Sequence, residues 1–163
     1  MFERIRAVAM DVDGVLTDGT FWWGTNNEEF KRFCFADVTG IPLAQQAGIK
    51  LALVSGESSQ AGMALVQRFA DKLKITDVYK GCHNKAAAVR DFANKHQLQL
   101  SEICYIGDDV NDLPAMGLVG LAAAPANAHS GAKAIAHYVI SKNGGFGAVR
   151  EVLDAIIEKL MKD

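Results

Sequence analysis

The sequence predicts an α/β fold, a doubly wound, Rossmann-like parallel sheet with helices on both faces. Short apolar runs alternate along the chain with longer stretches whose apolar residues recur at helical spacing. Several of these runs end in small or acidic residues, as buried strands do when polar groups gather at their carboxyl ends. The chain has 163 residues, 50% apolar and 22% charged, which fits a single globular domain over residues 1–163.

Each short apolar run is expected to be a strand, and each longer periodic stretch a helix. In chain order, strands are expected at residues 5–10, 50–54, 103–106, 119–123 and 138–140. Helices are expected at residues 38–46, 58–73, 85–96, 113–116 and 146–161. Strands that alternate with helices of this size are joined by crossovers, so the predicted sheet is parallel.

The segment before residue 35 breaks this alternation. Aromatic residues, among them Trp22 and Trp23, flank a Gly-Thr-Asn-Asn turn signal, which predicts a β-hairpin over about residues 15–35 that protrudes from the main sheet. Adjacent side chains of a strand face opposite sides, so a lone hairpin cannot bury both tryptophans. Either one packs on the body of the molecule and the other is exposed, or the hairpin forms a subunit interface.

Charge and composition exclude several classes of protein. The chain has 17 basic and 19 acidic side chains, so it lacks the basic excess of a dedicated nucleic-acid binder. No apolar run approaches the roughly 20 residues of a membrane helix, and the first residues do not resemble a signal peptide. Three cysteines without paired spacing fit a reducing compartment. We therefore expect a cytoplasmic protein that binds neither nucleic acid nor membranes.

Carboxylates follow two of the expected strands. Asp11 and Asp13 follow the first strand, and Asp108, Asp109 and Asp112 follow the third. Because the carboxyl ends of parallel strands meet at one edge of a sheet, these side chains are expected to gather there. Clustered carboxylates raise one another's pKa unless a cation neutralises them, and oxygen ligands at this density suit Mg²⁺. A lone acidic pair is usually a solvated turn, but here other reactive groups accompany it.

The remaining parts of a phosphoryl-transfer site are also present. Ser55 follows the second expected strand and offers a hydroxyl, next to Gly56, whose missing side chain lets a ligand approach the backbone. Lys85 begins an expected helix and supplies a positive charge. Together with the carboxylates, these groups could attack phosphorus, protonate a leaving oxygen and hold the phosphoryl oxygens. The combination predicts phosphoryl-transfer chemistry.

These motifs resemble those of the haloacid dehalogenase superfamily, which is dominated by phosphatases. Asp11-Val-Asp-Gly-Val, Ser55-Gly, Lys85 and Gly107-Asp-Asp-x-Asn-Asp match its four motifs. Asn143-Gly-Gly-Phe-Gly-Ala-Val-Arg-Glu narrows the resemblance to the 3-deoxy-D-manno-octulosonate 8-phosphate phosphatases and their relatives acting on nine-carbon 2-keto acid 9-phosphates. The resemblance implies a Mg²⁺-dependent phosphatase that hydrolyses a sugar-acid phosphate through an aspartyl-phosphate intermediate.

The resemblance also implies a role for each catalytic residue. Asp11 attacks the phosphorus, and Asp13 protonates the leaving alcohol and then activates the hydrolytic water. Ser55 and Lys85 bind the transferred phosphoryl group.

The implied metal site uses residues from the same motifs. Mg²⁺ is held by Asp11, the main-chain carbonyl of Asp13, and Asp108. Asp112 orients the site, and Asp109 holds a metal-bound water.

One residue that departs from the pattern of the octulosonate phosphatases implies which sugar-acid phosphate the chain prefers. Octulosonate phosphatases usually carry Arg after the Ser55-Gly56 equivalent, whereas this chain has Glu57, as the nine-carbon relatives do. Those relatives carry a lysine further on, for which Lys72 is the candidate. Ser55, Gly56, Glu57 and Lys72 are thus the expected substrate-binding residues, and octulosonate 8-phosphate is not the expected best substrate.

Two other functions compete with this interpretation. A receiver-like signalling module also uses acids, a hydroxyl and a lysine, but its phosphoacceptor follows a later strand than its metal-binding acids. Here Asp13 stands two residues after the candidate nucleophile, where it can support hydrolysis. A non-catalytic oligomerisation domain would not need the intact motif set.

Phosphatases of this superfamily usually close the site with an inserted cap. Neither residues 14–54 nor residues 56–84 are long enough to hold one, so the fold is predicted to be uncapped. Hairpins that associate in a closed ring would cover the exposed aromatic residues and the neighbouring sites. The resemblance implies a homotetramer with a hairpin-mediated interface.

Overall fold

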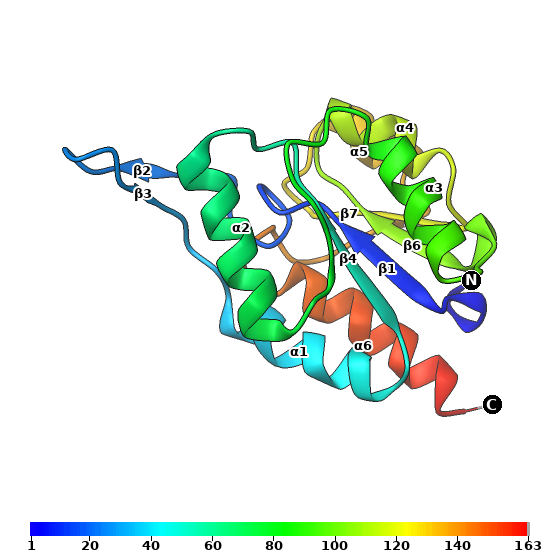
Figure 1. The fold of residues 1–163 in the computed structure, drawn as a ribbon. Helices are drawn as coiled ribbons and strands as arrows, with labels where there is room; N and C mark the ends of the chain where they lie inside the picture. The colour runs from blue at the N-terminus through cyan, green and yellow to red at the C-terminus, as the bar shows by residue number, and fades with distance from the viewer. Residues whose placement is uncertain (163) are drawn as a thin grey trace.

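The computed structural model describes residues 1–162 and has a parallel sheet at its centre (Figure 1). The sheet has six strands in the order β5-β4-β1-β6-β7-β8, all paired in parallel. In chain order these strands are β1 (Ala7–Met10), β4 (Lys50–Val54), β5 (Asp77–Tyr79), β6 (Ile103–Ile106), β7 (Leu121–Ala124) and β8 (Tyr138–Val139). The strand order runs outward in both directions from β1, which places a ligand-binding edge at the carboxyl ends of the central strands.

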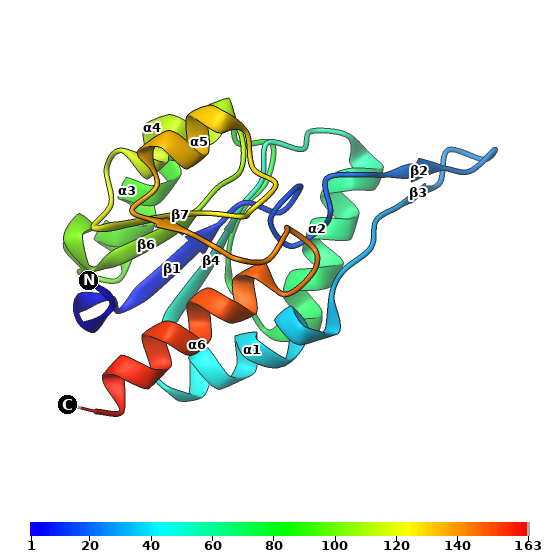
Figure 2. The same cartoon turned by 180° about the vertical axis from the view of Figure 1, so that it is seen from behind.

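Helices cover both faces of the sheet (Figures 1 and 2). The helices on one face are α1 (Phe35–Gln46), α2 (Gln60–Leu73) and α6 (Ala148–Leu160). Those on the other face are α3 (Lys85–Lys95), α4 (Leu113–Met116) and α5 (Ser130–Ile135). Short 3-10 helices are η1 (Phe2–Arg4), η2 (Leu100–Glu102) and η3 (Val110–Asp112). The predicted fold class is therefore confirmed.

Strand β1 shows why the sheet is buried on both sides. Val8 and Met10 pack into the core beneath α1, α2 and α6, whereas Ala7 and Ala9 face the core beneath α3 to α5. All four residues are buried. A strand covered on both faces reads as a continuous apolar run, which is the pattern that predicted it.

The hairpin projects from the body of the molecule, as Figure 1 shows. It consists of β2 (Trp22–Trp23) and β3 (Glu29–Phe30), paired antiparallel with Trp22 opposite Phe30. The two tryptophans are 72% and 75% exposed in the single chain, so neither packs on the body. The structure therefore does not show the first of the two alternatives, in which one tryptophan packs on the body of its own subunit.

The expected elements agree with the structure except at two places. The bounds of β4, β6 and α4 are those predicted, and the other predicted elements differ by a few residues at their ends. Strand β5 and helix α5 had no assigned range in the prediction. Among residues 1–162, no helix combines the length and apolar character needed to span a bilayer.

Candidate active site

A cavity of about 390 Å³ opens at the carboxyl ends of the central strands. It brings together residues that follow β1, β4 and β6, as the topology requires. The cavity is lined by Asp11, Asp13, Gly19, Gly56, Glu57, Cys82, His83, Lys85, Asp108, Asp109 and Asn111. Seven of the ten residues predicted for the site are among them. Of the other three, Ser55 and Asp112 are buried, and Lys72 lies elsewhere.

Lys85 binds the candidate nucleophile from the first turn of α3. Its Nζ lies 2.8 Å from Oδ2 of Asp11 and 2.8 Å from Oδ1 of Asp112. Burial alone would lower the pKa of Lys85, but the two carboxylates outweigh it and the pKa is raised. The ammonium therefore stays charged, and it fixes one oxygen of Asp11. The other oxygen accepts a hydrogen bond from the Val12 backbone N–H at 2.7 Å.

Asp112 is a fully occupied anchor beneath the site. Oδ1 accepts hydrogen bonds from Lys85 Nζ at 2.8 Å and from the Tyr105 hydroxyl at 2.7 Å. Oδ2 accepts from the backbone N–H groups of Asp108 at 3.0 Å and Asp109 at 3.1 Å. Four hydrogen bonds use the accepting capacity of a carboxylate, so Asp112 orients the loop after β6 and has no lone pair left for a metal.

Asp108 carries the free oxygen of the site. Its Oδ1 is buried and has no hydrogen-bond partner among the described residues. Gly14 leaves it room, because a Cβ at Gly14 would lie 2.0 Å from Oδ2 of Asp108, and Gly14 also has a positive φ of 89°. An unpartnered buried carboxylate oxygen is costly unless something compensates it.

A divalent cation fits this set of oxygens. Asp11, Asp108 and Asp112 each place one carboxylate oxygen within 4.8 Å of the others. Burial, followed by the charge of Asp112, raises the pKa of Asp11 to about 8 and that of Asp108 to about 7. A hard cation such as Mg²⁺ would compensate both groups and ligate the free oxygen. Since Asp112 is occupied, Asp11 and Asp108 are the side chains available to hold it.

Next to Asp13 and Glu57 lies a lysine that lines a second cavity and that the sequence interpretation did not assign to the site. Lys31 Nζ lies 2.9 Å from Oδ1 of Asp13, 3.3 Å from Oε2 of Glu57 and 3.4 Å from Oε1 of Glu29. Its side chain is only 2% exposed. Burial lowers the pKa of Lys31, but the contacts with Asp13 and Glu57 raise it by more than burial lowers it. The pKa of Lys31 is therefore above its ordinary value.

Ser55 is buried at the end of β4 and does not itself line the cavity. Its Oγ accepts a hydrogen bond from the backbone N–H of Glu57 at 3.1 Å, which leaves the hydroxyl proton free to be donated. Glu57 is held in turn, because its Oε1 accepts from the Ser59 backbone N–H at 2.8 Å.

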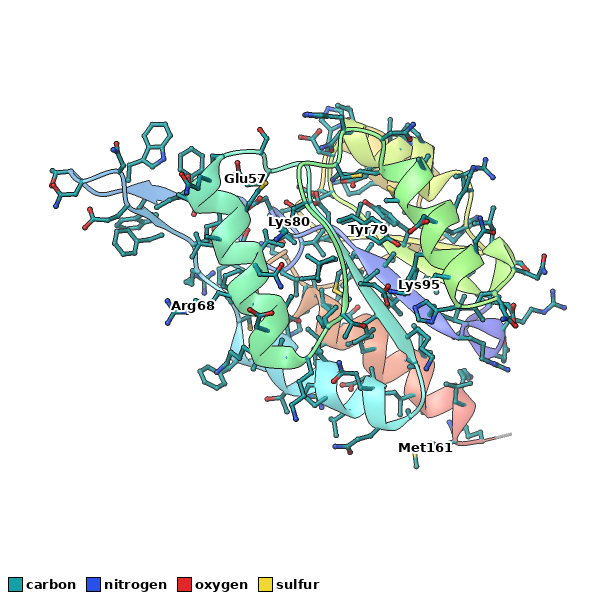
Figure 3. The ribbon with its side chains drawn as sticks, viewed as in Figure 1. Glu57, Arg68, Tyr79, Lys80, Lys95 and Met161 are labelled. Atoms are coloured by element: carbon teal, nitrogen blue, oxygen red, sulfur yellow. The ribbon has the colours of Figure 1, made fainter. Side chains whose placement is uncertain are left out.

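The structure does not bring Lys72 to Glu57. Lys72 lies in the last turn of α2, whereas Glu57 precedes that helix. At 1.5 Å per residue, the helix separates them by about 18 Å. Lys72 lines a different cavity of about 340 Å³, together with Arg68 and aromatic residues from the hairpin stem and α1. Figure 3 shows Arg68 projecting from the outer side of α2, with Glu57 near the start of the helix.

The glycine-rich segment 143–147 packs beneath the catalytic loop. The backbone N–H of Gly145 donates to the Val15 carbonyl at 3.1 Å. A Cβ at Gly144 would lie 1.8 Å from the carbonyl oxygen of Gly14. This close backbone approach explains the paired glycines, and the segment supports the loop that carries Asp13.

Comparison with known proteins identifies relatives over nearly the whole chain. The family model for haloacid dehalogenase-like hydrolases matches residues 58–153. The 3-deoxy-D-manno-octulosonate 8-phosphate phosphatase of Escherichia coli K12 is 40% identical over 155 residues, which cover 95% of this chain and 80% of that protein.

Solved structures agree with this comparison. A Moraxella catarrhalis 3-deoxy-D-manno-octulosonate 8-phosphate phosphatase, in complex with magnesium ion, phosphate ion and KDO, superposes with a TM-score of 0.91 and 36% identity, covering 97% of this chain and 88% of that chain. The Yersinia pestis enzyme superposes with a TM-score of 0.93 and 38% identity, covering 99% of this chain and 85% of that chain.

Proposed function

We propose that this chain, which belongs to the haloacid dehalogenase-like hydrolase family and is a phosphoric monoester hydrolase, removes phosphate from a 2-keto-3-deoxy sugar acid. The substrate is of the octulosonate 8-phosphate or the nonulosonate 9-phosphate type. The observation that carries the proposal is that Asp11 lies 2.8 Å from the Lys85 ammonium and has a carboxylate oxygen within 4.8 Å of one from Asp108, whose Oδ1 has no partner among the described residues. A nucleophile, a fixed cation and a metal-binding oxygen thus meet in one cavity.

In the first step, a carboxylate oxygen of Asp11 attacks phosphorus as the bond from phosphorus to the sugar oxygen breaks. The electron pair of that bond goes to the sugar oxygen, which takes a proton from Asp13. Asp13 then accepts a proton from water as the water oxygen attacks the phosphorus of the aspartyl-phosphate. The bond from phosphorus to the Asp11 oxygen breaks, its electron pair returns to the Asp11 carboxylate, and phosphate is released. Lys85 and the Ser55 hydroxyl stabilise the phosphoryl oxygens during both steps.

Mg²⁺ is the cofactor we assign to this site, held by the carboxylates of Asp11 and Asp108 and by the main-chain carbonyl of Asp13. When bound, it supplies positive charge to the phosphoryl oxygens and compensates the clustered carboxylates. Asp109 lines the same cavity, and we assign it to the water that would accompany the metal. Asp112 keeps the loop after β6 in position through its four hydrogen bonds.

A receiver-like module or a non-catalytic oligomerisation domain explains these features less well. Neither requires a second aspartate held at the mouth of the cavity, as Asp13 is by Lys31. The relatives at 36% to 40% identity are named as phosphatases. A phosphatase is therefore the function that the site supports best.

Glu57 is the residue we assign to selection of the sugar acid. It lines the cavity beyond the phosphate-binding groups and carries a negative charge there. Gly56 lets the substrate approach the backbone beside it. Lys72 can take part only from outside this cavity, since it lies at the other end of α2.

We further infer that the chain acts as one phosphatase domain over residues 1–163, in the cytoplasm, as a homotetramer joined through its hairpins. Exposed aromatic residues at Phe21, Trp22, Trp23 and Phe30 support a hairpin-mediated interface. The free thiols of the three cysteines support a reducing compartment.

The test is phosphate release from octulosonate 8-phosphate, a nonulosonate 9-phosphate and glucose 6-phosphate, each with Mg²⁺ and with excess chelator. Faster hydrolysis of one sugar-acid phosphate, abolished by the chelator, is the expected result. Equal rates on glucose 6-phosphate would overturn the substrate class.

A further inference from the structure

A second lysine contacts two residues that line the cavity, Asp13 and Glu57, and the roles assigned above do not use it. Lys31 is the residue that follows β3, so it leaves the hairpin and turns into the site. Its Nζ approaches both oxygens of Asp13, at 2.9 Å and 3.1 Å. An ammonium with an almost fully buried side chain and three carboxylate neighbours has little freedom to move.

Asp13 has few other restraints. Its side chain is 37% exposed, and within residues 1–162 the contacts of its carboxylate with a positively charged group are those with Lys31. A general acid contributes only when it lies within hydrogen-bond reach of the leaving oxygen. An exposed carboxylate without a fixed partner would spend time in other rotamers. The position of Asp13 therefore depends on Lys31.

We propose that Lys31 is a positioning residue that holds Asp13 at the place where the leaving oxygen departs. The inference rests on the proposed function, in which Asp13 gives its proton to the alcohol as the bond to phosphorus breaks. The same ammonium also contacts Glu57, the residue assigned to selection of the sugar acid.

The neighbouring cation provides a matched control. Arg32 lies on the other side of the same segment, where its Nη2 is 3.3 Å from Asp18 and its guanidinium lies 4.3 Å from the centre of the Phe146 ring. Its side chain is 52% exposed. Removal of Arg32 takes one positive charge from the hairpin stem without touching Asp13.

The experiment uses two probes of nearly equal shape, phenyl phosphate and p-nitrophenyl phosphate. Phenolate needs a proton to leave well, whereas nitrophenolate does not, so only the first probe depends on a well-placed general acid. The value of kcat/KM reports the first chemical step, before the water attacks. It is measured for the wild type and for Lys31→Met, Lys31→Arg and Arg32→Met.

We expect Lys31→Met to lose about 10- to 100-fold in kcat/KM for phenyl phosphate, a part of the 10²–10⁴ that general acid catalysis supplies. For p-nitrophenyl phosphate the loss is expected to stay below about threefold, since no proton is needed. Lys31→Arg is expected to lose less in kcat/KM for phenyl phosphate than Lys31→Met does. Arg32→Met is expected to change kcat/KM for the two probes equally, by less than about threefold.

Equal losses on both probes in a folded Lys31→Met protein, or no loss, would overturn the proposal. If Lys31→Met does not fold, Lys31→Ala serves for the same comparison, because it also removes the donor that contacts Asp13. Failure of the proposed function has a different signature, namely a wild type that hydrolyses both aryl phosphates but neither sugar-acid phosphate.

Discussion

At the level of single residues, two lysines with buried side chains each form ion pairs with a different set of carboxylates in the site. Lys85 holds Asp11 and Asp112 at the base of the cavity. Lys31 holds Asp13 at its mouth, together with two glutamates. The nucleophile and the acid are thus fixed by different cations on different elements, which lets their positions be perturbed separately.

Glu57 gives the first residue-scale prediction. Glu57→Arg reverses the charge on the selectivity side of the cavity, while Asp11, Lys85 and Asp108 are untouched. We expect the ratio of kcat/KM for octulosonate 8-phosphate to that for a nonulosonate 9-phosphate to rise at least tenfold. The rate with p-nitrophenyl phosphate should change much less. An unchanged ratio would mean that Glu57 does not contact the sugar acid.

Asp37 gives a prediction about pH and stability. This buried carboxyl in α1 accepts a hydrogen bond from the Arg150 backbone N–H at 2.8 Å, in the first turn of α6, and burial raises its pKa to about 6. The unfolded value is 3.8, so the folded protein binds more protons between these values. The contribution of Asp37 to stability is therefore present below about pH 4 and is lost as the pH rises through 6.

The change corresponds to about 3 kcal/mol between pH 4 and pH 7. Asp37→Asn keeps an oxygen that can accept from Arg150 and does not titrate. Urea unfolding of both proteins, at one protein concentration, should show the wild type losing stability relative to Asp37→Asn as the pH rises. A difference that stays constant with pH would contradict the assignment.

At the scale of elements, the site depends on how closely the glycine-rich segment approaches the catalytic loop. Gly144→Ala would place a methyl group 1.8 Å from the Gly14 carbonyl oxygen, so one of the two backbones must shift. We expect a loss of about 1–3 kcal/mol in stability, together with reduced turnover, because the shifted loop carries Asp13. Gly117→Ala is the control, since its nearest neighbour would be 3.4 Å away. Equal free energies of unfolding for the two variants would show that the loop accommodates the methyl group without cost, against this prediction.

The same scale shows which elements the sequence could predict. The ends of β4 and β6 were predicted to the residue because each apolar run stops at a small residue, Ser55 or Gly107. Strand β5 has only three residues and begins with Asp77, whose carboxylate binds Lys95 and His96, so no apolar run marks it. Helix α5 consists of six mostly small residues and carries no helical periodicity. Both form because the rest of the fold packs against them.

More of the site than of these two elements could be predicted from the sequence, because most of the site residues lie in short motifs directly after strands. Asp11, Asp13 and Asp108 needed only the rule that parallel strands end at one edge. Lys31 forms part of a Lys31-x-Phe match to the family but was not assigned to the site, because it lies 18 residues from Asp13 and reaches it only through the return strand of the hairpin. Glu57 and Lys72 were both predicted to bind the sugar acid, but the 14 residues of α2 hold them at opposite ends of that helix.

At the scale of the whole molecule, the hairpin is the surface most in need of a partner. Trp22→Glu combined with Trp23→Glu places two charges where the proposed tetramer buries aromatic rings. We expect the native chain to have the mass of a tetramer by light scattering and the double variant to have a lower mass. The variant should also lose selectivity among sugar acids more than its basal rate on p-nitrophenyl phosphate. A native monomer with full selectivity would exclude this assembly.

In the proposed reaction, Asp11 forms the covalent bond to phosphorus during hydrolysis of a sugar-acid phosphate. Its most direct test compares phosphate release by the wild type and by Asp11→Asn, with saturating Mg²⁺ and the better of the two sugar-acid phosphates. An amide cannot attack phosphorus as a carboxylate does, so turnover should fall below detection while the melting temperature stays within a few degrees. Near-normal phosphate release by a folded Asp11→Asn protein would exclude Asp11 as the nucleophile.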